Sequence, residues 1–355
     1  MSNLTYREQK DIENQETLRR ILAELPPYVK TFFRGIEPTT TSRTRIAYAT
    51  DLKSFFEFLK EANPDHKDKP MRDISLDIIN SLAATDIEEY LEHLRLYVRD
   101  GKKVTNSERG LKRKLSSLRT FYNYLGKHDM VTNNPMLKID TPKLHDKNIV
   151  RLEVNEVAEL LDVVESGDRL TQAQQLRHEK VKERDLAIVT LMLGTGIRVS
   201  ECVGLDITDL DFNQDRIRIV RKGGSESLVY FGDEVREALL SYLDIRKGEK
   251  PLPGSENALF LSSRKQRISV RNVEILVKKY SRTVTTLKKI TPHKLRSTYG
   301  TELYKETGDI YLVADVLGHK DVNTTRKHYA ALDEEHRRRA KDAVRLREKP
   351  SDQNP

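Results

Sequence analysis

The sequence has few of the residues that stabilise secreted or membrane-embedded proteins. It contains one cysteine, Cys202, so no disulfide can form within the chain, which excludes a disulfide-rich secreted scaffold. Tryptophan is absent, and aromatic residues make up only 6% of the chain. No stretch approaches the roughly 18 apolar residues that span a bilayer, and the polar N-terminus does not resemble a secretion signal. We therefore expect a soluble, cytoplasmic protein that does not act at a membrane.

Charge, by contrast, is abundant and unevenly distributed. The 355 residues include 63 Lys and Arg and 55 Asp and Glu, which gives a net charge of +8. Residues 51–100 hold 7 basic and 12 acidic side chains, whereas residues 101–150 hold 11 basic and 4 acidic ones. The local excess of +7 (11 minus 4) indicates a polyanionic partner more strongly than the small overall excess does.

Turn-forming residues divide the chain into several regions. Residues 1–38 predict a polar helical leader without a packed core. Residues 39–132 predict a small helical domain, because their apolar residues recur at helical spacing. Residues 133–150 include an Asn-Asn-Pro and a Thr-Pro sequence without sustained periodicity, which is typical of a linker. Residues 151–340 predict a second domain, and residues 341–355 a charged tail.

Local patterns indicate the fold class. In the first domain we expect one helix over residues 86–98 and another that begins at Thr105 or Asn106. In the second domain, RIRIV at 216–220 and LVYF at 228–231 flank a glycine turn, which is the pattern of a β-hairpin. The sequence therefore predicts a mostly α protein, in which an N-terminal helical bundle precedes an α+β domain of helices with a small antiparallel sheet.

The segment around the last helix of the first domain is strongly basic. Eight Lys or Arg residues fall between positions 102 and 127, against one acidic residue, Glu108. Such cations can neutralise phosphates and release counterions, although the same pattern also fits a solvated helix face. The candidate nucleic-acid-binding residues are Lys102, Lys103, Arg109, Lys112, Arg113, Lys114 and Arg119.

Two short glycine-containing patterns in the second domain carry a cation. GTGIRVSE at 194–201 places Arg198 at a helix start directly after two glycines, where helix-end amides can help to bind an anion. The sequence Arg221-Lys222-Gly223-Gly224 lies at the expected hairpin turn. Alone, a lysine on a turn is usually just solvated.

Two further patterns contain histidines. TPHKLR at 291–296 places His293 and Arg296 three residues apart on one helical face. LGHKDVNTTRKHY at 317–329 places His319 after a glycine and ends at Tyr329. Alone, His319 also fits a helix C-cap, and Tyr329 a half-buried core residue.

Taken in order, these patterns resemble the signature blocks of the tyrosine recombinase (phage integrase) family. TGIRVSEC, the KGG turn, HKLRST and LGHKDVNTTRKHY occur in the family's order and approximate spacing, and the resemblance extends over about residues 40–345. It implies a core-binding domain followed by a catalytic domain, which together clamp DNA. The catalytic residues that it implies are Arg198, Lys222, His293, Arg296, His319 and Tyr329.

The resemblance implies DNA strand cleavage through a covalent intermediate. Tyr329 would attack the scissile phosphate and form a 3′-phosphotyrosine, which frees a 5′-hydroxyl. Since a neutral tyrosine with a pKa of ~10 is a poor nucleophile, His293 would accept its proton. Lys222 would protonate the leaving oxygen as the general acid. No metal or other cofactor is expected, because the phosphotyrosine conserves the energy of the broken bond.

The remaining residues of the set would stabilise charge. Arg198 and Arg296 would each offer two donors to the equatorial oxygens of the phosphorane, a geometry that arginine provides and lysine does not. His319 would add a further donor. Glu201, one helical turn after Arg198, is expected to orient that arginine and to take no part in the chemistry.

The resemblance also implies partners. A final helix with one apolar side would dock on a neighbouring subunit, giving a homotetramer on two duplexes that each carry a double-stranded recombination site. A DNA translocase or another accessory protein would be a further partner. The chain shows no β-rich arm-binding domain, which favours a Xer-like recombinase that resolves chromosome dimers.

Other functions remain open at this point. An integrase of a phage, plasmid or transposon would use the same residues. A type IB topoisomerase also uses a similar set but relaxes DNA without pairing two sites. A non-catalytic DNA-binding protein on the same scaffold is the least favoured alternative, because it would be expected to lack at least one catalytic residue and none is missing.

Overall fold

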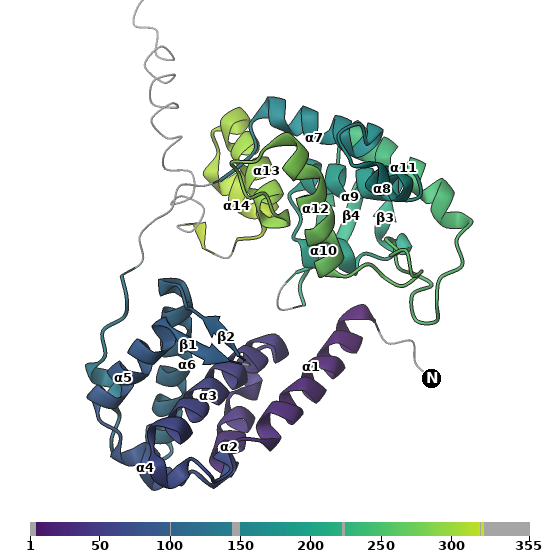
Figure 1. Ribbon diagram of the computed structural model, residues 1–355. Helices are drawn as coiled ribbons and strands as arrows, with labels where there is room; N and C mark the ends of the chain where they lie inside the picture. The colour runs from purple at the N-terminus through teal and green to yellow at the C-terminus, as the bar shows by residue number, and fades with distance from the viewer. Residues whose placement is uncertain (1–4, 100, 144–149, 222–223, 320, 323–355) are drawn as a thin grey trace, which may run out of the picture. The chain divides into compact units, whose positions relative to one another are not determined.

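The computed structural model describes residues 5–99, 101–143, 150–221, 224–319 and 321–322. The chain divides into two compact units, residues 1–147 and residues 148–355, which are described separately (Figure 1).

The N-terminal unit is a helical bundle with a short β-hairpin. Its elements are α1 (Tyr6–Ala23), α2 (Pro27–Ile36), α3 (Ser42–Ala62), α4 (Leu76–Ser81), α5 (Ala84–Arg95), β1 (Tyr97–Arg99), β2 (Lys102–Val104) and α6 (Glu108–Lys127). Short 3-10 turns cover Glu37–Thr39, Pro64–His66, Met71–Asp73 and Pro135–Lys138.

Aromatic side chains form the centre of this unit. Phe32, Phe56 and Phe121, from α2, α3 and α6, are fully buried. The rings of Phe32 and Phe121 meet edge to face with their centroids 5.3 Å apart, a geometry that adds about 0.5–1.5 kcal/mol to the burial itself. The two long helices are capped by Thr41 and Ser107, whose hydroxyls accept hydrogen bonds from main-chain N–H groups of the first turn.

The N-terminal helices belong to this unit, which corrects the expectation of an unpacked leader over residues 1–38. α2 buries Val29, Phe32, Phe33 and Ile36 in the core that it shares with α3 and α6. These positions follow the spacing i, i+3, i+4 and i+7, so they lie on one helical face. α1 packs along α3.

The helix expected over residues 86–98 is shorter than predicted. α5 ends at Arg95, and the chain continues into β1, which pairs with β2 in an antiparallel hairpin. The sequence Leu-Tyr-Val favours a strand at this point, and Gly101, with φ of +70°, supports the reversal of the chain. The hairpin presents Lys102 and Lys103 as exposed residues.

The segment predicted as a linker, residues 133–150, is packed onto the N-terminal unit over its first part. Met136 and Ile139 are buried in the core. The side chain of Asn134 accepts a hydrogen bond from the N–H of Met136 at 3.1 Å and so caps the 3-10 turn. The folded unit therefore continues beyond residue 133.

The C-terminal unit combines helices with a small sheet. Its elements are α7 (Val154–Ser166), α8 (Gln172–His178), α9 (Lys182–Thr195), α10 (Val199–Gly204), β3 (Leu210–Asp211), β4 (Arg216–Val220), β5 (Glu226–Tyr230), α11 (Asp233–Lys247), α12 (Val270–Val284), α13 (Pro292–Thr307) and α14 (Ile310–Leu317), with a 3-10 turn over Ile207–Asp209.

The sheet has the antiparallel order β3-β4-β5. Residues along β4 alternate between buried and accessible positions, with Ile217 and Ile219 facing the core. The hairpin of β4 and β5 matches the one expected from the sequence. The mostly α fold class with a small antiparallel sheet is therefore confirmed.

α9 is the central helix of the C-terminal unit. It packs against α7, α11 and α13, and its residues Ala187 to Met192 are buried. At its N-terminal end the buried carboxylate of Asp185 accepts hydrogen bonds from Tyr280 Oη at 2.8 Å and from Arg184 Nη2 at 2.6 Å. Burial raises the pKa of Tyr280, so this hydroxyl stays protonated and acts as a donor. None of the described helices is long and apolar enough to cross a membrane.

Candidate active site

The loop between α9 and α10 brings Arg198 to the surface. α9 ends at Gly196, which has φ of +64° and caps the helix in the left-handed conformation. A Cβ on Gly196 would lie 2.4 Å from Cδ1 of Tyr299 and 2.9 Å from Cδ2 of Leu317, so only glycine fits between α13 and α14. Arg198 then stands at the N-cap of α10, as the sequence predicts.

Glu201 holds Arg198 at two points. Arg198 Nη1 donates to Glu201 Oε1 at 2.8 Å, and the main-chain N–H of Arg198 donates to Oε2 at 2.7 Å. The contact fits the expected role of Glu201 as the residue that orients this guanidinium. Arg198 Nη2 also donates to the carbonyl oxygen of Gly318 at 3.0 Å.

Arg296 approaches the same region from α13. Its side chain is buried, with 5% of the residue exposed. Nη1 donates to the carbonyl oxygen of Gly196 at 2.5 Å, and Nη2 donates to that of Leu317. Arg198 and Arg296 thus bind consecutive carbonyl groups at the end of α14, 120 and 21 residues away from them in the chain.

The end of α14 forms a Schellman motif. Gly318 has φ of +62°, its N–H donates to the carbonyl of Asp315 at 2.8 Å, and the N–H of His319 donates to that of Ala314 at 2.8 Å. His319 is therefore held directly after the helix stop, where the sequence predicts it. The carbonyl end of a helix carries partial negative charge, which offsets the repulsion between the guanidiniums that gather there.

A third arginine, Arg221, binds this helix end and is absent from the set that the motifs predict. Its Nη1 and Nη2 donate to the carbonyl oxygens of Asp315 and Val316 at 3.1 Å and 2.9 Å. Three arginines from different parts of the chain therefore bind carbonyls at the C-terminus of α14, where the last carbonyls have no acceptor role in a further helical turn. Main-chain acceptors have no sequence signature, so the only signal for Arg221 is its place beside the hairpin turn.

His293 lies in the first turn of α13, after Pro292 at the first helical position. Thr291 is the N-cap residue of α13, and its side chain makes no capping hydrogen bond. His293 is exposed, whereas Arg296, one turn later, is buried. The helix thus carries a solvent-accessible imidazole next to an anchored guanidinium.

Two of the six predicted catalytic residues, Lys222 and Tyr329, lie outside the described residues. The other four are described. The structure brings Arg198, Arg296 and His319 together around the end of α14, and it places His293 on the helix that carries Arg296.

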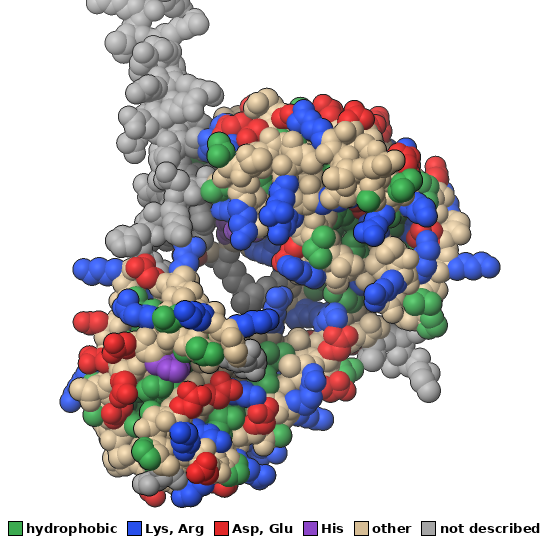
Figure 2. Space-filling model, viewed as in Figure 1, with side chains coloured by type: hydrophobic (Ala, Val, Ile, Leu, Met, Phe, Trp, Pro, Cys, Tyr) green, Lys and Arg blue, Asp and Glu red, His purple; other side chains and the backbone are tan. Residues whose placement is uncertain are grey.

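The predicted nucleic-acid-binding residues fall into two groups. Lys102, Lys103, Arg109 and Lys112 are exposed on β2 and around α6. In the view of Figure 2, basic side chains gather along the edge of the unit that carries the hairpin. Arg119 is different, because it is half-buried and donates at 2.6 Å both to the carbonyl of Ile139 and to the hydroxyl of Thr141.

Lys114 is buried, with 6% of the residue exposed, which corrects its prediction as a surface contact. Its Nζ lies 3.4 Å from Oδ1 of Asp51. The carboxylate of Asp51 is itself buried, and its Oδ2 accepts a hydrogen bond from Ser117 Oγ at 2.8 Å. Arg113 pairs with the same carboxylate but keeps 49% of its side chain exposed. A buried carboxylate thus holds one lysine inside the bundle and one arginine at its surface.

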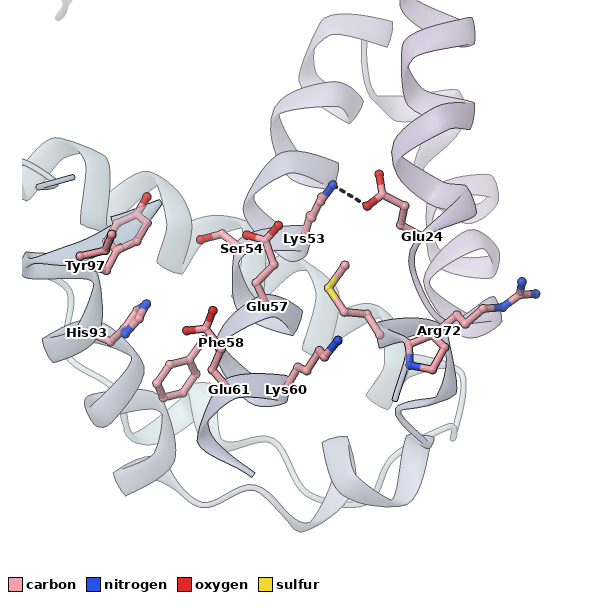
Figure 3. A pocket seen from close by; sticks show the side chains of 13 residues that line it. Glu24, Lys53, Ser54, Glu57, Phe58, Lys60, Glu61, Arg72, His93 and Tyr97 are labelled. Carbon is pink, nitrogen blue, oxygen red and sulfur yellow. Dashed lines mark hydrogen bonds and ion pairs between the residues drawn. The ribbon is translucent and has the colours of Figure 1, made fainter. Parts of the chain in front are cut away.

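A hollow of about 700 Å³ lies in the N-terminal unit between α3, α5 and the Met71–Asp73 turn (Figure 3). Its lining mixes Lys60 and Arg72 with Glu57 and Glu61, and Lys53 is paired with a further carboxylate, Glu24, at 2.6 Å. The balance of charges does not favour an anion. The hollow contains none of the predicted catalytic residues.

Among the described residues, no group of three or more His, Cys, Asp or Glu side chains is placed to hold a metal ion. Cys202, on α10 beside Glu201, is fully buried. Burial, together with the neighbouring Glu201 carboxylate, raises the pKa of its thiol to about 12.

Comparisons with known proteins identify relatives along most of the chain. The model of the phage integrase family matches residues 150–336. The chain is 33% identical over 328 residues to tyrosine recombinase XerC of Caldanaerobacter subterraneus subsp. tengcongensis, an alignment that covers 89% of this chain and 85% of that protein. It is 30% identical over 348 residues to tyrosine recombinase XerS of Lactococcus lactis subsp. cremoris, covering 91% of this chain and 96% of that protein.

Solved structures share the fold at lower identity. XerH site-specific recombinase bound to a palindromic difH substrate aligns with a TM-score of 0.66 and 18% identity, over 93% of this chain and 89% of that one. A lambda integrase dimer bound to a COC′ core site aligns with a TM-score of 0.59 and 16% identity, over 85% of this chain and 93% of that one.

Proposed function

We propose a chromosomal role for this chain, which belongs to the phage integrase family and is a site-specific tyrosine recombinase of the Xer type. In this role it cuts and rejoins double-stranded DNA at a dedicated chromosomal site and so resolves chromosome dimers. The observation that carries the proposal is the alignment with XerS, which covers 91% of this chain and 96% of that relative. The integrases among the structural neighbours share the fold at lower identity, 16% for lambda integrase.

The proposed reaction transfers a phosphoryl group to Tyr329. The tyrosine oxygen attacks the scissile phosphorus, and its proton passes to His293. The bond from phosphorus to the 5′-oxygen breaks, and Lys222 gives a proton to that oxygen. The products are a 3′-phosphotyrosine and a free 5′-hydroxyl, and attack by a 5′-hydroxyl of the partner duplex reverses these steps.

The geometry around α14 supports this scheme. Arg198 keeps 34% of its side chain exposed while Glu201 fixes its direction, so a phosphate can reach it without reorganisation of the guanidinium. Arg296 is buried and holds both Gly196 and Leu317, which fixes the two loops next to Arg198 and His319. We propose that Arg198, Arg296 and His319 stabilise the charge of the phosphorane.

The proposed partners are two DNA duplexes and three further copies of the chain. XerH and lambda integrase are described as bound to recombination-site DNA. The exposed cations of β2 and α6 supply phosphate contacts from the N-terminal unit. A tetramer formed by exchange of the C-terminal segment, in cooperation with a DNA translocase, completes the proposal.

Covalent trapping in the host genome tests this function. The full-length protein is denatured rapidly in cells, and DNA attached to it is recovered and sequenced, with Tyr329→Phe as the matched control. We expect attachment at one short site near the replication terminus in the wild type and none in the variant. Attachment at the ends of a mobile element would replace the chromosomal role with integration, and equal recovery with Tyr329→Phe would overturn the mechanism.

A further inference from the structure

Arg221 links the β4–β5 hairpin to the helix end that precedes His319. Its two terminal nitrogens donate to the carbonyl oxygens of Asp315 and Val316, which lie 94 and 95 residues further along the chain. The hairpin turn that follows Arg221 in the sequence contains Lys222. The contact therefore connects Arg221, the residue before Lys222 in the sequence, to α14, the helix that ends just before His319.

The contact is closely fitted. A Cβ on Gly318 would come within 1.6 Å of Arg221 Nη1, so the guanidinium lies directly against Gly318, whose φ of +62° also favours glycine. Arg221 Nε is buried and has no hydrogen-bond partner among the described residues. Since burial of an unpaired polar atom is unfavourable, the bonds of the other two nitrogens are what hold the side chain here.

The main chain of Arg221 is fixed as well. Its N–H donates to the carbonyl of Ser225 at 2.8 Å, and its carbonyl accepts from the N–H of Gly224 at 3.0 Å. Arg221, which directly precedes Lys222 in the sequence, is therefore held by its main chain as well as by its side chain.

We propose that Arg221 is a positioning residue, bound to the end of α14, on which proton transfer from Lys222 to the 5′-oxygen depends. The inference rests on the proposed function, in which Lys222 gives its proton to the 5′-oxygen as the bond to phosphorus breaks. One helix end then binds the side chains of Arg198, Arg221 and Arg296.

A change of leaving atom tests the inference. Single-turnover cleavage is measured on two duplexes that carry the trapped genomic site, one with an ordinary phosphodiester and one with a 5′-bridging phosphorothiolate. A thiolate leaves without protonation, so loss of the general acid is harmless on the second duplex. We expect Arg221→Ala to slow cleavage of the phosphodiester by about 100-fold, as misplacement of a catalytic group does, and to cleave the phosphorothiolate within about threefold of the wild-type rate.

Three further variants make the result interpretable. Lys222→Ala should cleave the phosphodiester roughly 10²–10⁴-fold more slowly than the wild type. On the phosphorothiolate its cleavage rate should return close to that of the wild type. Arg221→Lys, which keeps the charge but cannot span two carbonyls, should behave like Arg221→Ala. Arg218→Ala removes an exposed arginine of the same strand, with 50% of its side chain accessible, and should cleave both duplexes at the wild-type rate.

The outcomes distinguish the positioning role of Arg221 from the general-acid role of Lys222 on which it rests. If Arg221→Ala loses the same factor on both duplexes, or loses nothing on either, the positioning role is wrong. If Lys222→Ala fails to recover on the phosphorothiolate, the general-acid assignment is wrong and the positioning role falls with it. Circular dichroism and DNA affinity identify any variant whose loss on both duplexes comes from misfolding.

Discussion

The carboxylate of Glu201 is the buried anchor of Arg198. Only 4% of the Glu201 side chain is exposed, against 34% for Arg198, and the two are joined through both a side-chain and a main-chain nitrogen of the arginine. The guanidinium is thus held from the protein side while solvent, or a phosphate, reaches it from the other. In this arrangement the Glu201 carboxylate orients the guanidinium, and the guanidinium of Arg198 is left accessible to bind a phosphate.

Glu201→Gln should slow cleavage without changing the shape of the site. The substitution replaces a charge-assisted hydrogen bond with a neutral one, and a loss of about 1.4 kcal/mol corresponds to a tenfold lower rate. The measurement is single-turnover cleavage in a double-mutant cycle with Arg198→Ala. In the Arg198→Ala background, Glu201→Gln should have almost no further effect. Fully additive losses would show that Glu201 acts on something other than Arg198.

Gly196→Ala should destabilise the C-terminal unit. The left-handed backbone costs roughly 1–2 kcal/mol for a residue with a Cβ, and the clash with Tyr299 and Leu317 adds about 1–3 kcal/mol. Gly308→Ala is the matched control, because Gly308 has φ of +66° but no atom within 4 Å of the added Cβ. Urea unfolding should show the larger loss for Gly196→Ala. Equal losses would mean that the close approach of α13 and α14 contributes nothing.

Lys112→Ala should change DNA affinity and Lys114→Ala should change stability, although the two residues are only two positions apart. Lys112 is exposed, so its loss should reduce the slope of log affinity against log salt by about 0.9 and leave stability almost unchanged. Lys114 is buried against Asp51, so its loss should lower the free energy of unfolding by about 3 kcal/mol. Fluorescence anisotropy on the trapped site and urea unfolding measure the two quantities. A salt slope that changes only with Lys114→Ala would reverse the assignment.

The thiol of Cys202 should be inert in the folded protein. Burial raises its pKa to about 12, so at pH 8 it is protonated as well as inaccessible. In the unfolded chain a thiol has a pKa of about 8.5 and reacts readily. Because the unfolded chain loses this proton first, the contribution of Cys202 to stability falls as the pH rises above about 8.5. Labelling with iodoacetamide should appear only in denaturant, and Cys202→Ala should remove it. Rapid labelling of the native protein would contradict the burial.

Local signals predicted the parts of the site that depend on neighbouring residues. Gly196 and Gly318 both adopt the left-handed conformation that their places after apolar helices indicate, and they put Arg198 and His319 where the motifs suggest. The β4–β5 hairpin also follows from alternation and a glycine turn. In each case the residues that determine the structure are close together in the sequence.

The errors come from contacts between distant residues. Lys114 lies within the apolar stripe of α6, between Leu111 and Leu118, and this spacing was a signal that it faces inward. What makes the burial tolerable is Asp51, 63 residues earlier, which periodicity does not show. The spacing of Val29, Phe32, Phe33 and Ile36 likewise indicates a buried face of α2, but the polar residues of α1 give the segment as a whole a polar composition.

The arginines at the end of α14 all bind main-chain oxygens. Every amino acid carries the same carbonyl group, so replacing the side chain of Asp315 or Val316 leaves the acceptors of Arg221 in place. The same holds for Leu317 and its bond from Arg296. Gly318 is the exception, because its conformation and its contact with Arg221 exclude a Cβ. Asp315, whose side chain is exposed, can therefore be substituted during evolution without loss of the hydrogen bonds that hold the arginines at the end of α14.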